Sequence, residues 1–363
     1  MRLFQNVGLY PSYFPRLAML SKGSRDFSSY IQTFLDDRFG APHYLTPVLS
    51  RDPESFFTIG DYSDIQRMWA REQGMRSKAD NEEILLAQIE HQRSEVFYNM
   101  DPMRFGSQFV RRLPGCVKRS IAWRAAPSPG ADFGAYDRIV CNFPTILQHY
   151  KSLGWKAAYF SPAHDPELDA YASNTERPID VLFVGGYSRH HKRRASILDA
   201  VSELRGQVRV DFRLDRSRLT RLAESALGKM LPLAAHRRPK DISAVSGEPV
   251  FGRSLYKLLS QSKIVLNGAV DMAGEDRGNM RCFEAMGSGA LMISDDGRYP
   301  EHMIDGTNFR AYKSASQAVD QIRRAIDSPE ERRVMAARGH EALSLHYSKA
   351  MQWKRFQQLI SEI

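Results

Sequence analysis

Apolar residues in the first half of the chain alternate between strand-length runs and segments of helical period. The strand-length runs lie at residues 3–9, 43–49, 95–99, 117–123, 138–143 and 157–160. The segments of helical period lie at residues 27–39, 63–71 and 81–92. Strands separated by helix-length segments predict a parallel sheet that carries helices on both faces.

The same alternation starts again after a polar break. Three prolines interrupt the segment SPAHDPELDAYASNTERP, which predicts an interdomain linker at residues 166–178. Further strands are predicted at 180–186, 208–214, 242–245, 264–267 and 291–294, and helices at 316–327, 330–346 and 349–363. The predicted fold is α/β, with two Rossmann-like domains at residues 1–165 and 179–345. A C-terminal helix, residues 346–363, carries an apolar stripe that must pack back on the fold.

Composition agrees with a globular protein of two domains. The 363 residues are 42% hydrophobic and 26% charged, and no run approaches eighteen apolar residues, so we expect no membrane-spanning helix. The N-terminal residues read as a strand and a loop, not as a signal peptide. Three scattered cysteines without metal spacing fit a reducing compartment, so the expected location is cytoplasmic.

The formal net charge of +9 favours an anionic partner, unless the protein is simply a basic enzyme. Residues 213–240 hold eight Lys and Arg against Asp215 and Glu224, with leucines between them. This pattern is typical of a basic surface helix, and peripheral contact with an anionic membrane at its inner face is the alternative. The segment lacks aromatic residues that would stack on bases, so nucleic acid is not an expected partner.

Two stretches of the second half carry candidate chemistry. Gly185 and Gly186 end a predicted strand, and Lys192 and Arg193 open the helix that follows. Glycines before a helix N-terminus let a phosphate approach free N–H groups, so this turn predicts an anion site. A solvated basic helix is the alternative, because no G-x-G-x-x-G fingerprint is present.

The other stretch is residues 267–301. A short helix is predicted at 279–286, with Asn279 as its N-cap and Gly287 and Gly289 ending it in left-handed conformations. Glu284 lies among apolar neighbours in this helix, where an acidic residue is not needed for solubility. Its carboxylate can accept hydrogen bonds from two vicinal sugar hydroxyls. Arg281, one turn earlier, can form an ion pair with Glu284 or contact a phosphate. The chain's histidines lack the spacing of a metal site.

Four segments together resemble bacterial glycosyltransferases of the GT-B superfamily, with the spore-maturation-type group as the nearest likeness. These segments are DVLFVGG, LYKLLSQSKIVLN, GNMRCFEAMGSGALMISDD and HMIDGTNFRAY. The resemblance covers about residues 179–360, and the N-terminal half only in architecture. It implies a GT-B fold with a cleft between two Rossmann-like domains. The C-terminal domain would bind a nucleotide-diphosphate sugar donor, and the N-terminal domain a glycan, lipid or protein acceptor.

The resemblance also implies roles for individual residues. Glu284 matches the second member of a Glu-x7-Glu pair that contacts the ribose, and Asp276 stands where the first member would be. Lys192 and Arg193 match the diphosphate-binding cations, and Phe251 lies where the base is held. Asn279 and Arg281 complete the expected donor site, and no metal or other cofactor is expected.

The implied activity is a retaining, metal-independent hexosyl transfer. An inverting enzyme would need a general base for the acceptor, and Asp101, at the end of a predicted strand, is the candidate. Because it precedes Pro102, a turn or cap role for Asp101 is the alternative. A GT-B-shaped binding or scaffold protein without catalysis, and a nucleotide-sugar epimerase, are the alternative functions.

Overall fold

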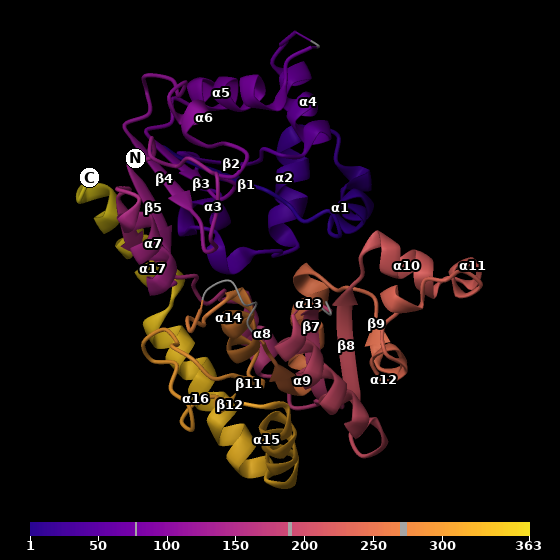
Figure 1. Ribbon diagram of the computed structural model, residues 1–363. Helices are drawn as coiled ribbons and strands as arrows, with labels where there is room; N and C mark the ends of the chain where they lie inside the picture. The colour runs from indigo at the N-terminus through magenta and orange to yellow at the C-terminus, as the bar shows by residue number, and fades with distance from the viewer. Residues whose placement is uncertain (77, 188–190, 269–273) are drawn as a thin grey trace. The chain divides into compact units, whose positions relative to one another are not determined.

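The computed structural model describes residues 1–76, 78–187, 191–268 and 274–363, and these form two compact units. The first unit comprises residues 1–163, 274–276 and 347–363, and the second comprises 164–268 and 277–346. Helix α8 (Glu167–Ala172) occupies part of the segment predicted as a linker and belongs to the second unit. Each unit is built around one parallel sheet, as the alternating pattern predicts (Figure 1).

The first unit has a six-stranded parallel sheet in the order β2-β1-β3-β4-β5-β6. Its strands are β1 (Leu3–Val7), β2 (Ser55–Ile59), β3 (Val96–Asn99), β4 (Arg119–Trp123), β5 (Arg138–Cys141) and β6 (Ala157–Tyr159). Its helices are α1 (Phe14–Leu20), α2 (Phe27–Asp36), α3 (Thr46–Leu49), α4 (Ser63–Glu72), α5 (Asn81–His91), α6 (Ser107–Val110), α7 (Pro144–Ser152) and α17 (Lys349–Ser361). Helix α5 begins at a capping box formed by Asp80 and Glu83, with Asp80 as its N-cap.

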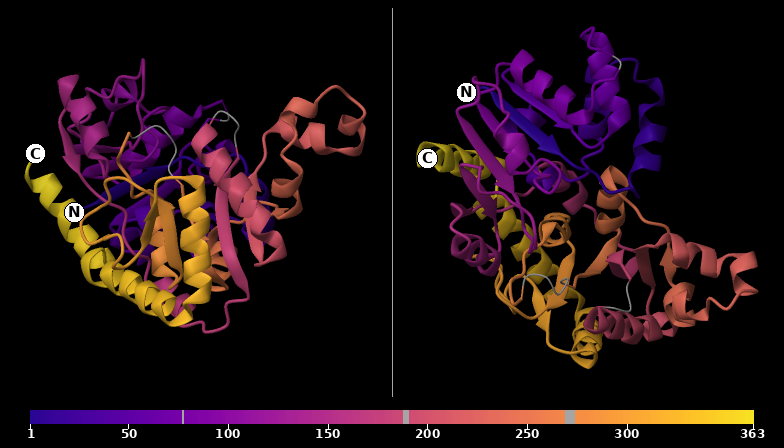
Figure 2. Two further views of the ribbon diagram at one scale, coloured as in Figure 1. Left: turned by 60° about the horizontal axis from the view of Figure 1, so that its bottom comes forward. Right: turned by 45° about the horizontal axis from the view of Figure 1, so that its top comes forward.

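The second unit has a six-stranded parallel sheet in the order β12-β11-β10-β7-β8-β9. Its strands are β7 (Ile179–Gly186), β8 (Val210–Asp215), β9 (Ser246–Gly247), β10 (Ser262–Leu266), β11 (Leu291–Asp295) and β12 (Arg310–Tyr312). Besides α8, its helices are α9 (Lys192–Ser202), α10 (Arg218–Glu224), α11 (Ala226–Lys229), α12 (Lys240–Ala244), α13 (Gly252–Ser260), α14 (Met280–Gly287), α15 (Ala315–Asp327) and α16 (Pro329–His346). Figure 2 shows α15 and α16 lying against β11 and β12.

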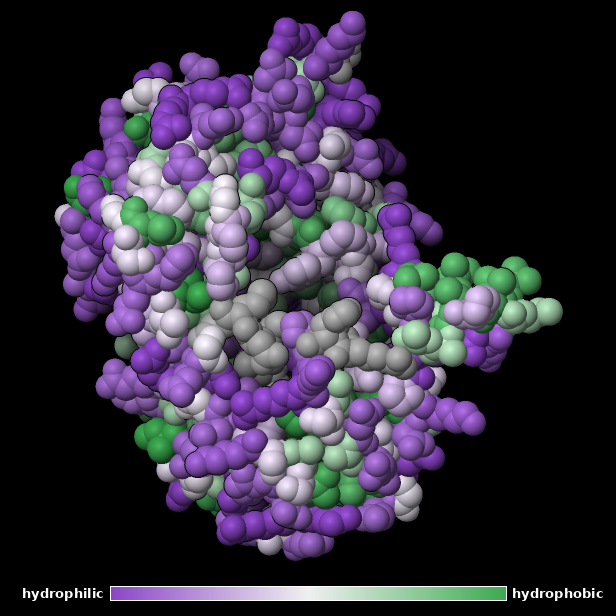
Figure 3. Space-filling view, in the orientation of Figure 1, coloured by the Kyte–Doolittle hydropathy of each residue, from purple (hydrophilic) through white to green (hydrophobic). Residues whose placement is uncertain are grey.

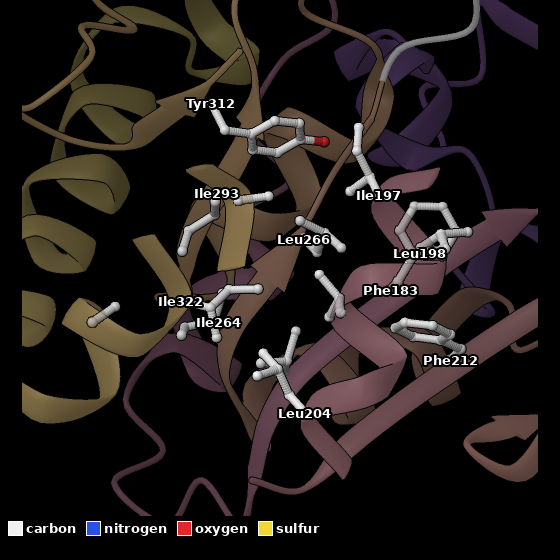
Figure 4. Close-up of a cluster of buried hydrophobic side chains, with 14 of the residues drawn as sticks. Phe183, Ile197, Leu198, Leu204, Phe212, Ile264, Leu266, Ile293, Tyr312 and Ile322 are labelled. Carbon is white, nitrogen blue, oxygen red and sulfur yellow. The ribbon is translucent and has the colours of Figure 1, made fainter. Parts of the chain in front are cut away.

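Aliphatic and aromatic side chains fill the space between this second sheet and its helices. Phe183 of β7, Leu266 of β10 and Ile293 of β11 point to the same side, where they meet Ile197 of α9 and Ile322 of α15 (Figure 4). All five are less than 5% exposed. This core fixes β7, β10 and α9 relative to one another, and the residues that follow their ends form the candidate site.

Two strand predictions are wrong, and both fail for a local reason. Residues 46–49 of this run form α3, in whose first turn Pro47 lies, and His43 ends a 3₁₀ turn. The strand that follows along the chain and pairs with β1 is Ser55–Ile59. Proline cannot donate to a sheet ladder but fits the first turn of a helix, where the N–H would be unpaired. Residues 242–245 fall mainly in α12, and the short strand β9 follows at Ser246. Ile242 and Val245 are three residues apart, which is the spacing of a helix face.

The C-terminal helix packs back on the first unit, as predicted. Phe356 and Leu359 of α17 are fully buried, and the Phe356 ring lies 4.9 Å from that of Tyr98 in β3. The ammonium group of Lys349 donates to the backbone carbonyl groups of Ala41 and Tyr44 at 2.7 and 2.8 Å. Within the described ranges, the helices fall short of the length and apolar character needed to cross a bilayer.

Candidate active site

The carboxyl ends of β7 and β10 in the second unit are joined by one arginine. Arg194, in the first turn of α9, donates from its guanidinium to the carbonyl oxygen of Gly268 at 2.5 Å. A longer contact of 3.5 Å reaches the carbonyl of Gly186, the last residue of β7. Gly185 and Gly186 end the strand with no side chain that would cover this edge. In open α/β sheets, ligands bind at this carboxyl edge.

Further cations lie at the same edge. Lys192 and Arg193 are exposed in the first turn of α9. Tyr312, which ends β12, donates its hydroxyl to the Asn267 carbonyl at 2.6 Å. Burial and then Asp295 raise the pKa of Tyr312, whereas Arg193, Arg194 and Arg277 act in the opposite direction. The exposed Lys192 and Arg193, beside Arg194 in the same helix turn, make this sheet edge positively charged, and such an edge attracts anions.

Arg277 is held by a buried ion pair. Its Nε lies 2.7 Å from Oδ2 of Asp295, the last residue of β11, and both side chains are less than 10% exposed. This pairing uses one oxygen of Asp295 to hold a cation at the sheet edge. Asp296 is more exposed, and its carboxylate lies 3.8 Å from Nζ of Lys313.

Asn279 is the N-cap residue of α14, as predicted, but its side chain caps no N–H of that helix. Its amide reaches Oδ1 of Asn267 at 3.4 Å, and Asn267 in turn donates to the Ser294 hydroxyl at 3.0 Å. These contacts tie the start of α14 to the ends of β10 and β11. The N–H groups of the first turn of α14 thus lie at the same sheet edge as the arginines.

Glu284 lies near the middle of α14 and is 2% exposed. Its Oε2 accepts a hydrogen bond from Nη1 of Arg281 at 2.5 Å. Burial raises the pKa of Glu284, Arg281 opposes this rise, and the nearby carboxylate of Asp165 adds to it. Glu284, the residue expected at the ribose, therefore forms an ion pair with Arg281, which is one of the two partners expected for Arg281. Within the described chain the Arg281 Nε–H is buried without a hydrogen-bond acceptor. A ligand oxygen would satisfy that donor.

Phe251 is the half-buried N-cap residue of α13, and its backbone is extended. Gly252 after it has φ of +57°, a conformation that a side chain would strain. The helix can begin directly behind the ring because this position is glycine.

Asp276 is grouped with the first unit, not with the donor residues of the second. Its side chain is fully buried, and Oδ2 accepts a hydrogen bond from the backbone N–H of Thr145 at 2.7 Å. Thr145 lies in the first turn of α7, next to Pro144. A carboxylate at a helix N-terminus satisfies a free N–H group and interacts favourably with the helix dipole.

Asp101 follows β3 at the carboxyl edge of the first sheet. Burial raises the pKa of Asp101, and Arg104 and Arg124 partly oppose the rise. Gly8, which follows β1, makes room for this carboxylate, because a Cβ at Gly8 would lie 2.7 Å from Oδ2 of Asp101. The Asp101 carbonyl accepts hydrogen bonds from the N–H groups of Arg104 and Phe105 at 3.2 and 3.1 Å, so the residue forms a turn after β3. Contact of its carboxylate with an acceptor stays a prediction.

Comparison with known proteins gives the class of the protein. Residues 187–358 match the family model described as "Glycosyl transferase-like". The chain is a glycosyltransferase of the GT-B fold. The matched residues include α9, α13 and α14, which carry the proposed donor contacts. No curated protein matches the sequence significantly.

Solved structures resemble this glycosyltransferase over its whole length. HepE of Anabaena, crystallised with UDP and glucose, is 11% identical with a TM-score of 0.61, and the match covers 100% of both chains. A glycosyltransferase of Rickettsia africae is 10% identical with a TM-score of 0.53, covering 99% of this chain and 97% of that one. Sucrose-phosphate synthase of Thermosynechococcus elongatus is 10% identical with a TM-score of 0.52, covering 100% and 99%. At such identities the likeness establishes the fold.

The structure of the glycosyltransferase reveals a second carboxylate beside Asp101. Asp61 follows β2, is 7% exposed, and accepts a hydrogen bond from the backbone N–H of Leu9 at 3.1 Å. Arg104 lies 3.4 Å from Asp61 and 3.7 Å from Asp101. Burial raises the pKa of Asp61, and the charge of Asp101 adds to this rise. Among the described residues, Oδ1 of Asp61 is buried without a donor.

Sequence reasoning missed Asp61 because the strand before it was placed at residues 43–49. With β2 at Ser55–Ile59, the segment Ile59-Gly60-Asp61 shows a strand end followed by glycine and a carboxylate. The contact of Arg194 with Gly268 was equally hidden, since it depends on the pairing of β7 with β10.

The glycosyltransferase also gathers two histidines that lack metal spacing in sequence. His164 and His340 lie on either side of Asp169, with Nε2 to Oδ1 distances of 2.7 and 3.4 Å. Asp169 and His340 border a cavity of about 670 Å³. Gly287 is the last residue of α14 and is not left-handed, whereas Gly289 is, with φ of +68°. A Cβ at Gly287 would lie 2.8 Å from Nδ1 of His164, so glycine there permits close packing.

Proposed function

We propose that this glycosyltransferase takes its sugar from a nucleotide-diphosphate sugar bound at the carboxyl edge of the second sheet. The observation that carries the proposal is Arg194, which donates to the carbonyl groups of Gly186 and Gly268 at the two strand ends. Lys192 and Arg193 are exposed in the same helix turn, beside the Gly185-Gly186 strand end. A diphosphate carries negative charge that these cations would stabilise. Structures of HepE with UDP and with UDP-glucose support a uridine nucleotide as the first to test.

The ribose is proposed to lie against α14. Glu284 uses Oε2 for Arg281, and its other oxygen remains available to accept from a ribose hydroxyl. The buried Nε–H of Arg281 would donate to an oxygen of the same ligand. Phe251 is proposed to pack against the base. Asp276 receives no donor role in this scheme, because its carboxylate caps α7.

Sugar transfer breaks the bond between the anomeric carbon and the diphosphate, and negative charge develops on the departing oxygen. Guanidinium groups and the N–H groups at the start of α14 would stabilise that charge, so the proposed transfer needs no metal. We propose a retaining reaction on a hydroxyl group of a glycan, lipid or protein. Asp101 would accept a hydrogen bond from the acceptor hydroxyl, with its burial keeping its pKa high.

Nucleotide binding tests the proposal directly. We expect UDP or UDP-sugar to raise the melting temperature of the protein equally with and without EDTA, and Arg194→Gln to reduce this shift strongly. Arg323→Gln is the matched control, because Arg323 is an exposed arginine on α15. A panel of nucleotides and nucleotide sugars that gives neither stabilisation nor donor hydrolysis would overturn the proposal. Binding without turnover on any acceptor would favour a scaffold, and a released epimer would favour an epimerase.

A further inference from the structure

Residues 216–238 form a projection from the second unit between β8 and α12, which we call the 216–238 projection. It contains α10, α11 and a short 3₁₀ turn at Ala234–His236. The guanidinium of Arg237 holds it together by donating to the carbonyl groups of Ala223 and Gly228, both at 3.0 Å. The guanidinium of Arg237 thus holds the backbone of α10 next to that of α11.

The acidic residue of the projection is neutralised within it. Glu224 accepts two hydrogen bonds from Arg238, at 2.8 and 2.7 Å, and lies 3.4 Å from Arg216. The pKa of Glu224 is lowered: desolvation acts to raise it, but the hydrogen bonds from Arg238 prevail. Glu224 therefore stays ionised and paired. The remaining cations Arg218, Arg221 and Lys229 are exposed at the surface.

The apolar side chains of the projection point outward. Leu227 and Met230 are 75% and 85% exposed, whereas the small residues Ala223 and Gly228 are buried. The other exposed apolar residues are Leu219, Leu222 and Leu231, at 43%, 49% and 49%. Figure 3 shows a continuous hydrophobic surface on this projection. Soluble surfaces scatter such residues singly, and a cluster of five marks an interaction site.

We propose that the 216–238 projection inserts its leucines and methionine into the interface of a membrane that contains anionic lipids. Flexible aliphatic side chains suit the acyl boundary, and the three exposed cations suit lipid phosphate groups. An uncharged apolar groove on a protein partner would leave Arg218, Arg221 and Lys229 without counter-charges. The proposal concerns where the enzyme works and stands independently of the donor that it uses.

Co-sedimentation of the full chain with vesicles tests this proposal. The protein should bind vesicles of phosphatidylcholine with phosphatidylglycerol, bind pure phosphatidylcholine much less, and lose binding as salt is raised. The double variant Leu227→Ser with Met230→Ser should bind at least about tenfold more weakly, because two apolar side chains no longer enter the interface. Arg218→Gln with Lys229→Gln should weaken binding only to anionic vesicles.

The matched control is Leu345→Ser with Met351→Ser, which removes apolar side chains that are 60% and 48% exposed elsewhere. It should bind vesicles like the unaltered protein. Unchanged melting temperatures and UDP-induced shifts would show that all variants are folded. Failure of the unaltered protein to bind anionic vesicles would overturn the proposal, and so would equal binding by the two serine variants. A dimer that Leu227→Ser with Met230→Ser abolishes, without vesicle binding, would assign the surface to self-association instead.

Discussion

Oδ2 of Asp276 accepts a hydrogen bond from the backbone N–H of Thr145 at 2.7 Å, and this contact anchors a distant part of the chain to the start of α7. Asp276 can therefore act as a helix cap or as a carboxylate in sugar transfer, and these two roles can be distinguished. A cap requires an acceptor oxygen, whereas a carboxylate that acts on a sugar requires its charge. Asparagine at this position keeps the oxygen and removes the charge.

We therefore expect Asp276→Asn to retain the fold and most sugar transfer, because its amide oxygen can still accept from Thr145. Asp276→Ala should lower the free energy of unfolding by about 1–3 kcal/mol, since it leaves a buried N–H unpaired. Urea unfolding and donor turnover of both variants check this. Loss of turnover in a fully stable Asp276→Asn protein would show instead that the charge acts in the reaction.

A second prediction concerns the ion pair in α14. Glu284→Gln should weaken UDP binding at least about tenfold, because a charged acceptor for the ribose hydroxyls becomes neutral. Isothermal titration with UDP measures this change. Glu341→Gln is the control, since Glu341 is an exposed glutamate on α16. UDP affinity that stays constant in Glu284→Gln would contradict contact between Glu284 and the ribose.

The paired carboxylates of the first unit predict a pH dependence. Because burial raises the pKa of Asp101, transfer should decline with falling pH at a higher pH than an ordinary carboxyl would give. Asp61→Asn removes a neighbouring negative charge, so it should move this decline to lower pH. Asp101→Asn should abolish this decline of transfer at low pH, together with most of the transferase activity. A pH profile that is the same in all three proteins would exclude Asp101 from the reaction.

The same shifts predict an effect on stability. A raised folded-state pKa means that the native protein holds protons more tightly than the unfolded chain, so stability falls as pH rises through that range. Asp61→Asn removes one buried charge and keeps an acceptor for the Leu9 N–H. Its melting temperature should exceed that of the unaltered protein at pH 7, and the difference should shrink toward pH 4. A lower melting temperature at pH 7 would show that the ionised carboxylate is stabilising.

Sequence reasoning succeeded where a local pattern determines the structure. The apolar strand β7 that runs into Gly185 and Gly186 is set by residues within a few positions of each other. It failed where the same local signal suits two structures. The apolar run at 43–49 fits a strand if Pro47 is ignored, but Pro47 favours a helix start. Because the second strand was predicted there, the true strand β2, which ends just before Asp61, was not predicted.

Contacts between distant segments were beyond local patterns. The predicted anion site names Lys192 and Arg193, whereas the residue of the same helix turn that joins the two strand ends is Arg194. The spacing of Asp276 and Glu284 predicts two carboxylates in one site, but the Asp276 carboxylate accepts a hydrogen bond from the backbone N–H of Thr145. Spacing along a chain fixes neighbours only within one helix or strand, and a loop separates these two residues.

The last prediction concerns the anchor of the C-terminal helix. Besides its bonds to Ala41 and Tyr44, the Lys349 ammonium donates to Pro42 at 3.0 Å and to Gln352 at 3.1 Å, and the residue is 8% exposed. Lys349→Met removes the ammonium donor from the carbonyl groups of Ala41, Pro42 and Tyr44, although Ala41 still accepts from the Tyr44 N–H and Pro42 from the Ala163 N–H. The loss should lower the free energy of unfolding by about 1–3 kcal/mol. Lys354→Met, on an exposed face of α17, should change it little.

Lys349 also acts on a neighbouring histidine, which gives this prediction a second readout. Burial lowers the pKa of His43 to about 3, and the charge of Lys349 contributes to the lowering. The unfolded chain therefore binds more protons than the native protein between about pH 6.5 and 3, and stability falls as pH is lowered through that window. Lys349→Met raises the folded-state pKa of His43, so its stability should fall less steeply in that window. Parallel stability curves for the two proteins would refute the coupling between Lys349 and His43.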